Sequence, residues 1–175
     1  MTRIALASLF ALAAAAAAPR SASATEIRLR GGLEAPLISH VSSGNTSGTF
    51  YFTDSLQPAL NLMLSAYPAS IVGFDAEFRY GFAATGSGTR SGTSIGPGVT
   101  FNPPVLPLYA RASRPRHLEP GGVNLGLRIA GGLSIPLVLL SLYLEGAIDF
   151  PLAGDGVDAF KSQIFSLGGG VWFKF

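Results

Sequence analysis

The sequence contains no cysteine, only two histidines and few charged residues. The absence of cysteine excludes disulfide frameworks, thiol catalysis and cysteine-ligated metal or iron–sulfur sites, and leaves His40 and His117 as the only imidazoles. Charged residues make up 13% of the chain and hydrophobic residues 48%, a balance that argues against disorder. The length of 175 residues is enough for one domain.

The first 24 residues have the pattern of a secretory signal peptide. A short basic start is followed by an apolar run over Ile4 to Ala18, and Ala22-Ser23-Ala24 supplies a cleavage site before Thr25. The run is shorter than the roughly 20 residues of a membrane-spanning helix. We therefore predict a cleaved signal peptide over 1–24 and a folded domain over 25–175. Loss of Arg3 and Arg20 leaves as many cations as acids, so the basic pI does not indicate a nucleic-acid partner.

The rest of the chain alternates between apolar and polar residues with a period of two. The pattern is clearest from Val138 to Phe150 and from Val72 to Phe82, and such alternation predicts strands with one apolar face. Six further segments share it: 27–37, 60–66, 95–101, 106–112, 123–134 and 165–175. The longer strands reach the roughly 9 to 11 residues that cross a bilayer, and we expect the short second strand to extend back towards Tyr51.

The connections between these eight strands alternate between long and short. Long polar gaps lie at 40–50 and 85–92, with shorter versions at 114–121 and 154–159. Tight, proline-containing turns are expected at 67–70, 102–104 and 134–136. Long loops at one end and short turns at the other are typical of outer-membrane barrels, whereas a soluble β-sandwich, the alternative for an alternating chain, seldom has them.

The C-terminal segment Phe165–Phe175 (FSLGGGVWFKF) alternates to its last residue and ends on phenylalanine. It resembles the terminal strand of bacterial outer-membrane barrels, and the whole architecture resembles small eight-stranded barrels of the OmpA/OmpX type. The resemblance implies an all-β, eight-stranded antiparallel up-and-down transmembrane barrel in the bacterial outer membrane, with periplasmic termini. It also implies recognition of the strand ending in Phe175 by the barrel-assembly machinery, contact with outer-membrane lipids, and a possible ligand for the surface loops.

Two further features bear on the strands. Pro36, Pro97 and Pro107 fall inside predicted strands. A closed barrel has no edge strand on which the missing N–H of proline would cost nothing, so we expect bulges or register breaks at these residues.

Aromatic residues near strand ends are expected to form girdles at the membrane interfaces: Tyr51, Phe52, Tyr80, Phe82, Phe150, Phe173 and Phe175.

The polar faces carry nearly balanced charges that we assign to the barrel lumen. They are Arg28, Arg30, Glu34, Asp75, Glu77, Arg79, Arg111, Arg128, Glu145, Asp149 and Lys174. An eight-stranded barrel is only wide enough to be filled by side chains, so we predict a charged network that closes the lumen. The alternative is a narrow, porin-like pore for ions or small solutes, which small lumen residues would permit: Gly73, Gly81, Gly96, Gly98, Gly126, Gly132, Gly168 and Gly170.

A lipid-modifying enzyme is the second alternative. His40 lies near Ser39, Ser42 and Ser43 in the first long gap, and His117 lies near Glu119 in the third, so a base, a carboxylate and a hydroxyl would share one end. No spacing defines a triad, and serine is common in loops because it forms turns. We therefore expect a structural or surface-interaction protein with no catalytic, metal or cofactor site.

Overall fold

The computed structural model describes residues 25–43, 46–51, 58–69, 71–82, 92–103, 106–119, 122–137, 139–153 and 159–175. The predicted signal peptide, the gap at 85–91 and Phe52 lie outside these residues. Ten strand segments account for nearly all of the described chain: β1 (Glu26–Ser43), β2 (Thr46–Tyr51), β3 (Ala59–Ala69), β4 (Val72–Gly81), β5 (Gly92–Phe101), β6 (Leu108–Ser113), β7 (Arg116–Glu119), β8 (Gly122–Pro136), β9 (Ser141–Ala153) and β10 (Gln163–Lys174).

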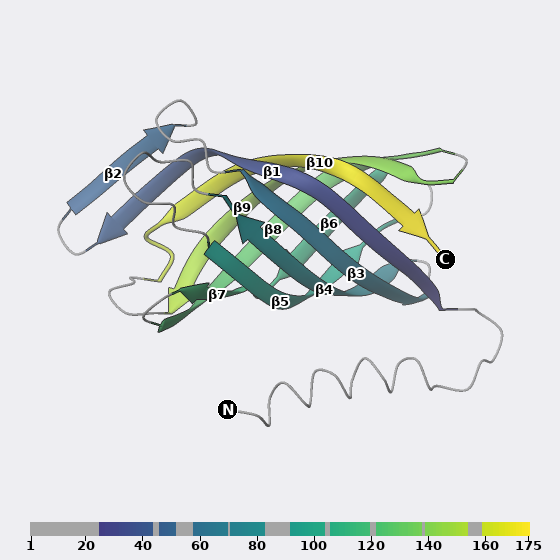
Figure 1. Ribbon diagram of the computed structural model, residues 1–175, viewed down its shortest axis with the longest axis horizontal. Helices are drawn as coiled ribbons and strands as arrows, with labels where there is room; N and C mark the ends of the chain where they lie inside the picture. The colour runs from purple at the N-terminus through teal and green to yellow at the C-terminus, as the bar shows by residue number, and fades with distance from the viewer. Residues whose placement is uncertain are drawn as a thin grey trace, which may run out of the picture.

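The segments form one closed antiparallel sheet (Figure 1). The order β10-β9-β8-β6-β5-β4-β3-β1 is completed by pairing between β10 and β1, which runs from Arg28↔Lys174 to His40↔Gln163. Short β7 continues β6, because both pair with β5 on one side and β8 on the other. The barrel therefore has eight strands and an up-and-down order, and the predicted fold class is confirmed.

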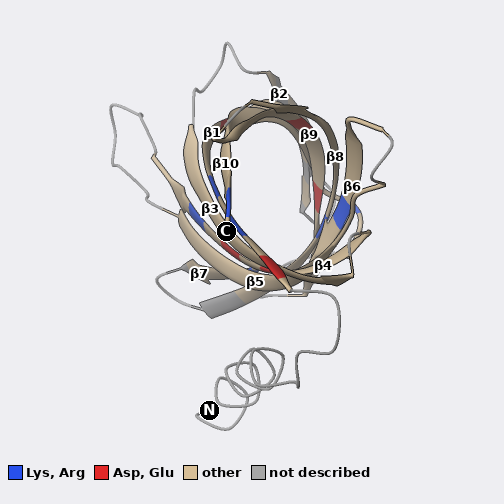
Figure 2. Cartoon of the chain, turned by 90° about the vertical axis from the view of Figure 1, so that its right-hand side faces the viewer, with Lys and Arg blue, Asp and Glu red and all other residues tan. Residues whose placement is uncertain are grey.

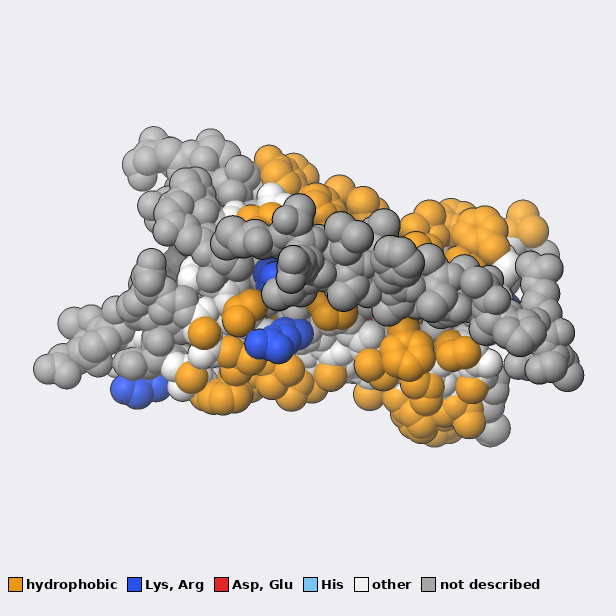
Figure 3. All heavy atoms as spheres, turned by 90° about the horizontal axis from the view of Figure 1, so that it is seen from below, with side chains coloured by type: hydrophobic (Ala, Val, Ile, Leu, Met, Phe, Trp, Pro, Cys, Tyr) orange, Lys and Arg blue, Asp and Glu red, His pale blue; other side chains and the backbone are white. Residues whose placement is uncertain are grey.

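Side chains alternate between the inside and the outside of this barrel. In β3, Asn61, Met63 and Ser65 are buried while Leu62 and Leu64 are exposed, and β9 alternates in the same way. Figure 2 shows the strands closing around the barrel axis, with the positions of charged residues coloured along them, and the side chains of Arg30, Glu77 and Arg128 are among the charged ones that are buried. On the face seen in Figure 3, hydrophobic side chains cover much of the described wall. The barrel is thus polar inside and apolar outside, the reverse of a water-soluble fold.

Several predicted boundaries are wrong. Tyr51 belongs to β2, a hairpin partner of β1 above the barrel, and β3 begins only at Ala59, so the second barrel strand does not extend back to Tyr51. The predicted turn at 134–136 is strand: β8 runs to Pro136 and β9 begins at Ser141. Likewise the gaps at 40–50 and 114–121 contain strand segments, because polar and glycine-rich sequences continue the barrel ladder beyond its apolar wall.

The three strand prolines are accommodated in three ways. At Pro36 the pairing of β1 with β10 shifts between Pro36 and Ile38, so the expected register break is present. Pro97 keeps regular pairing with β4, and the interruption lies in the facing strand, where Arg114 N–H donates to the Pro97 carbonyl between β6 and β7. Pro107 precedes β6 instead of lying within it, so no bulge is needed there.

All the elements assigned in the described residues are strands. Within the described ranges, no helix is long and apolar enough to cross a membrane.

Candidate functional site in the barrel lumen

The interior of the barrel holds a continuous network of ion pairs. It contains four arginines and four carboxylates, supplied by inward positions of β1, β4, β6, β8 and β9: Arg30, Glu34, Glu77, Arg79, Arg111, Arg128, Glu145 and Asp149. The strands present these residues inward because each lies at the polar phase of its two-residue alternation. Eight of the eleven predicted lumen residues therefore meet in one network.

Arg128 lies at the centre of this network. Its guanidinium donates to both carboxylate oxygens of Glu34, at 3.1 and 2.6 Å, and to Asp149 Oδ2 at 2.6 Å. Arg79 reaches the same two acids, with Nη2 2.6 Å from Glu34 Oε1 and Nη1 3.4 Å from Asp149 Oδ1. Two arginines thus hold two carboxylates that come from opposite ends of the sequence, on β1 and β9.

A second part of the network lies towards the chain termini. Arg111 bridges Glu77 at 2.8 Å and Glu145 at 2.9 Å, and Arg30 Nη1 donates to Glu145 Oε2 at 2.7 Å. Neutral donors complete the shell of Glu77: Asn61 Nδ2 and Ser113 Oγ each lie 2.9 Å from its carboxylate. Each of these charges is therefore paired and hydrogen-bonded, as buried ions require.

An aromatic layer lies next to the network on the terminal side. Trp172 packs against Tyr109 and Tyr143, with ring centroids 5.1 and 6.2 Å apart. The Arg30 guanidinium lies 3.6 Å from the centroid of Tyr143, a cation–π contact, while Tyr109 Oη donates to Glu145 at 3.0 Å. The rings therefore pack together inside the barrel and contact the charged network.

The remaining predicted lumen charges lie outside the central network. Arg28 and Lys174 both pair with Glu26 at the terminal mouth, where the Lys174 side chain is 68% exposed. Arg28 also stacks on Tyr67, 4.0 Å from its ring centroid. Asp75 is buried and accepts a hydrogen bond from Thr100 Oγ1 at 2.5 Å. These three residues belong to the lumen wall and its mouth.

Two glycines that face the lumen, Gly73 and Gly132, lie against aromatic side chains. A Cβ added at Gly73 would lie 2.6 Å from Cζ of Tyr67, and one at Gly132 would lie 2.6 Å from Oη of Tyr109. Both distances are shorter than real Cβ contacts. At these two positions the absence of a side chain lets the tyrosine rings lie close to the sheet.

Comparison with known proteins identifies the class of fold. No protein-family model matches the chain, and no curated protein matches it. Neisserial surface protein A superposes with a TM-score of 0.56 at 16% identity, over 89% of this chain and all of that one. Ail, the attachment invasion locus protein of Yersinia pestis, superposes with a TM-score of 0.51 at 11% identity, over 87% of this chain and all of that one. Both are small eight-stranded outer-membrane barrels.

The fold is that of a small outer-membrane β-barrel. This agrees with the resemblance drawn from the sequence. At such low identity the likeness is one of fold, so the role of this barrel has to be argued from its own residues.

The two histidines of this barrel do not form one site. His40 in β1 contacts Thr49 across the hairpin, with Nδ1 3.1 Å from Oγ1. His117 lies in β7, on the opposite side of the closed strand order, where its Nε2 would be 3.3 Å from a Cβ at Gly126. In the part of the chain that the structure describes, no group of three or more histidines and acids is arranged to hold a metal ion.

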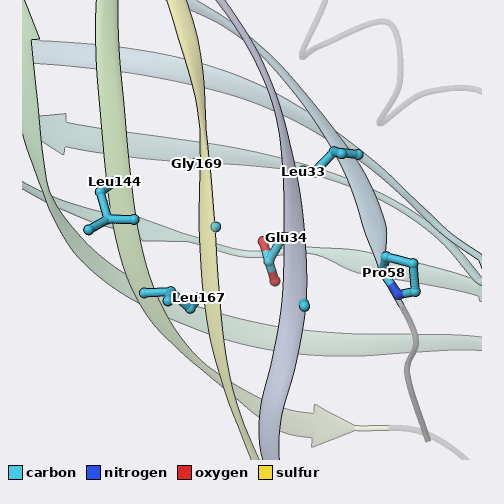
Figure 4. Close-up of a pocket in the computed structure, with 8 residues that line it drawn as sticks. Leu33, Glu34, Pro58, Leu144, Leu167 and Gly169 are labelled. Atoms are coloured by element: carbon cyan, nitrogen blue, oxygen red, sulfur yellow. The ribbon is translucent and has the colours of Figure 1, made fainter. Parts of the chain in front are cut away.

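A shallow hollow of about 300 Å³ lies on the outer wall of the barrel (Figure 4). Leu33, Leu144 and Leu167 border it, and Gly169 leaves its floor without a side chain. The polar side chain among its lining residues is Glu34, whose carboxylate is held by arginines in the lumen. The hollow is therefore an apolar depression and offers no reactive group.

Sequence reasoning missed part of the lumen. It assigned Tyr109, Tyr143 and Trp172 to the polar strand faces without assigning them a role, and it did not include Glu26. The signal for the three aromatic residues was available, because their positions in the alternation match those of Arg111, Glu145 and Lys174. The alternation does not give the pairing register between strands, and it is this register that places the three rings at the same height along the barrel axis.

Proposed function

We propose that this chain is an integral protein of the bacterial outer membrane, exported by residues 1–24, whose lumen is closed and whose role is structural or surface-interacting. The observation that carries the proposal is the charge-balanced network of four arginines and four carboxylates across the lumen. It rests against an aromatic layer, so polar and aromatic groups together occupy the interior.

The outer wall supports the membrane location. Leu133, Leu144, Ile129 and Phe101 are each between 42% and 51% exposed, and similar residues surround the barrel. Monomeric soluble proteins rarely expose a continuous apolar surface of this extent, whereas lipid acyl chains solvate it without cost. Closure of β10 on β1 also leaves no unpaired barrel edge, as a spanning sheet requires.

The lumen supports a closed barrel over a pore. Arg30, Arg111, Arg128, Glu77 and Glu145 are all at most 3% exposed, although they line the interior of a barrel. Ions permeating this path would have to displace paired charges, at a cost of several kcal/mol for each buried pair broken.

We propose contacts with outer-membrane lipids along the wall, with the assembly machinery through the strand ending in Phe175, and with a surface ligand through the loops.

Two measurements test the proposal. The first is the gel mobility of the protein from the outer-membrane fraction in SDS. We expect boiled and unboiled samples to migrate differently, because folded barrels resist SDS until heated.

The second is planar-bilayer recording of the refolded protein, which is expected to give no channel steps. The double variant Arg111→Ala/Tyr109→Ala is expected to produce channel steps, because it removes side chains from both the charged network and the aromatic layer of the lumen. Regular single-channel steps from the unmodified protein would overturn closure, and a soluble periplasmic protein without heat-dependent mobility would overturn the membrane location.

A further inference from the structure

Among the side chains that the structure describes, the exposed charges are positive. They belong to Arg114, Arg116, Lys161 and Lys174. The Asp and Glu side chains that it describes are all buried or half-buried: Glu26, Glu34, Asp75, Glu77, Glu145 and Asp149. The lumen therefore takes up the acids and leaves the described outer surface cationic.

Arg114 and Arg116 differ from the other described arginines. Five arginines pair with carboxylates, namely Arg28, Arg30, Arg79, Arg111 and Arg128. Arg114 and Arg116 have no ion-pair partner among the described residues. They alternate with buried Ser113 and Pro115, so they occupy the outward face of the β6–β7 strand, two positions and about 7 Å apart.

Their surroundings place them at the loop-side border of the apolar wall. Arg116 pairs with Ile95, which is 51% exposed, and Leu118 beyond it is 46% exposed. Tyr80 on β4, the neighbour of β5, packs edge to face with Phe82, which follows β4 at the same end. Figure 3 shows cationic side chains among hydrophobic ones towards this end of the wall. Aromatic and cationic residues at the edge of an apolar wall mark the headgroup level of a bilayer.

We propose that Arg114 and Arg116 bind a phosphate group of an anionic lipid headgroup in the leaflet at the loop end. This inference rests on the proposed membrane location. Guanidinium groups match phosphate oxygens in charge and donor geometry, and exposure leaves their side chains free to form this contact. Val99, which pairs with Ala112 on the membrane side of Arg114 and is 45% exposed, would contact the acyl chains of the same lipid.

The test uses the full mature chain refolded in phosphatidylcholine vesicles that contain phosphatidylglycerol. Ile95→Trp places an indole beside Arg116, and the single native tryptophan, Trp172, is inside the barrel and 4% exposed. Quenching by brominated phosphatidylglycerol relative to brominated phosphatidylcholine measures lipid preference at this position. We expect a preference for phosphatidylglycerol that falls roughly fivefold for each arginine replaced by glutamine.

Two control variants define the interpretation. The double variant Arg114→Lys/Arg116→Lys is expected to keep most of the preference for phosphatidylglycerol because it keeps both charges. Lys174→Gln, at the other end of the barrel, is expected to keep all of this preference.

An unchanged preference for phosphatidylglycerol in Arg114→Gln/Arg116→Gln would overturn the phosphate site while leaving the membrane location intact. Loss of the preference in millimolar inorganic phosphate at constant ionic strength would assign the site to the free anion and overturn the lipid assignment. Absence of quenching by either lipid would overturn the membrane location itself.

Discussion

Replacing Arg128 by methionine tests the central claim about the lumen. The substitution keeps much of the side-chain volume and removes the guanidinium that binds Glu34 twice and Asp149 once. Breaking a buried pair by removing one partner costs about 3–5 kcal/mol. Arg79 still contacts both acids, so we expect the lower end of that range, about 3 kcal/mol.

Urea unfolding in lipid bilayers, followed by the fluorescence of Trp172, measures this loss. With a slope of roughly 2 kcal/mol per molar, 3 kcal/mol lowers the midpoint by about 1.5 M. Lys174→Met is the matched control, because it removes a cation whose side chain is 68% exposed at the terminal mouth, and it is expected to change stability by less than about 1 kcal/mol.

A second variant separates charge imbalance from lost packing. Arg128→Met with Asp149→Asn restores the balance to three cations and three acids, so we expect it to recover about 1 kcal/mol of the single-variant loss. Equal midpoints for Arg128→Met and Lys174→Met would refute the claim that the network stabilises the barrel. Strict additivity of the two lumen substitutions would refute direct coupling between Arg128 and Asp149.

Three further substitutions test other parts of the structure. Gly73→Ala, which forces a methyl group against the Tyr67 ring, is expected to lower the urea midpoint by the equivalent of about 1–3 kcal/mol, while Gly146→Ala, where no atom lies within 4 Å, is expected to leave it nearly unchanged. Leu144→Arg on the outer wall is expected to cost about 2–4 kcal/mol in a bilayer, and a stable, soluble variant would contradict the lipid-facing assignment. His40→Ala and His117→Ala are expected to leave the outer-membrane lipid profile unchanged, and an altered profile would support the lipid-modifying alternative.

The alternation of residues was sufficient to predict the number of strands and the face on which each charge lies. Arg128 and Glu34 show where that information ends. Each lies on a predicted polar face, but they are 94 positions apart, and their pairing depends on how the strands are staggered around the barrel. Stagger is a property of the closed sheet and is not contained in any one strand.

Strand ends were predicted less well than strand faces. Tyr67 was assigned to a turn because Pro68 follows it, yet β3 continues to Ala69 and Tyr67 stacks with Arg28 inside the lumen. Pro136 was likewise assigned to a turn and is the last residue of β8. Proline removes a donor and fixes φ, but at the end of a strand neither effect costs a ladder hydrogen bond, so it does not define the exact boundary.

The glycines and the charges of the lumen act together. Gly168 lies between Glu34 on β1 and Glu145 on β9, so two carboxylates from flanking strands share the space beside a residue without a side chain. A larger residue there would meet the Glu34 backbone and Cβ at 3.2 to 3.3 Å. The glycines that suggest a conduit in the sequence therefore lie beside the paired side chains of the lumen. Under the closed-lumen proposal, converting this barrel into a pore would require losing the paired side chains, because additional small residues alone leave those side chains in place.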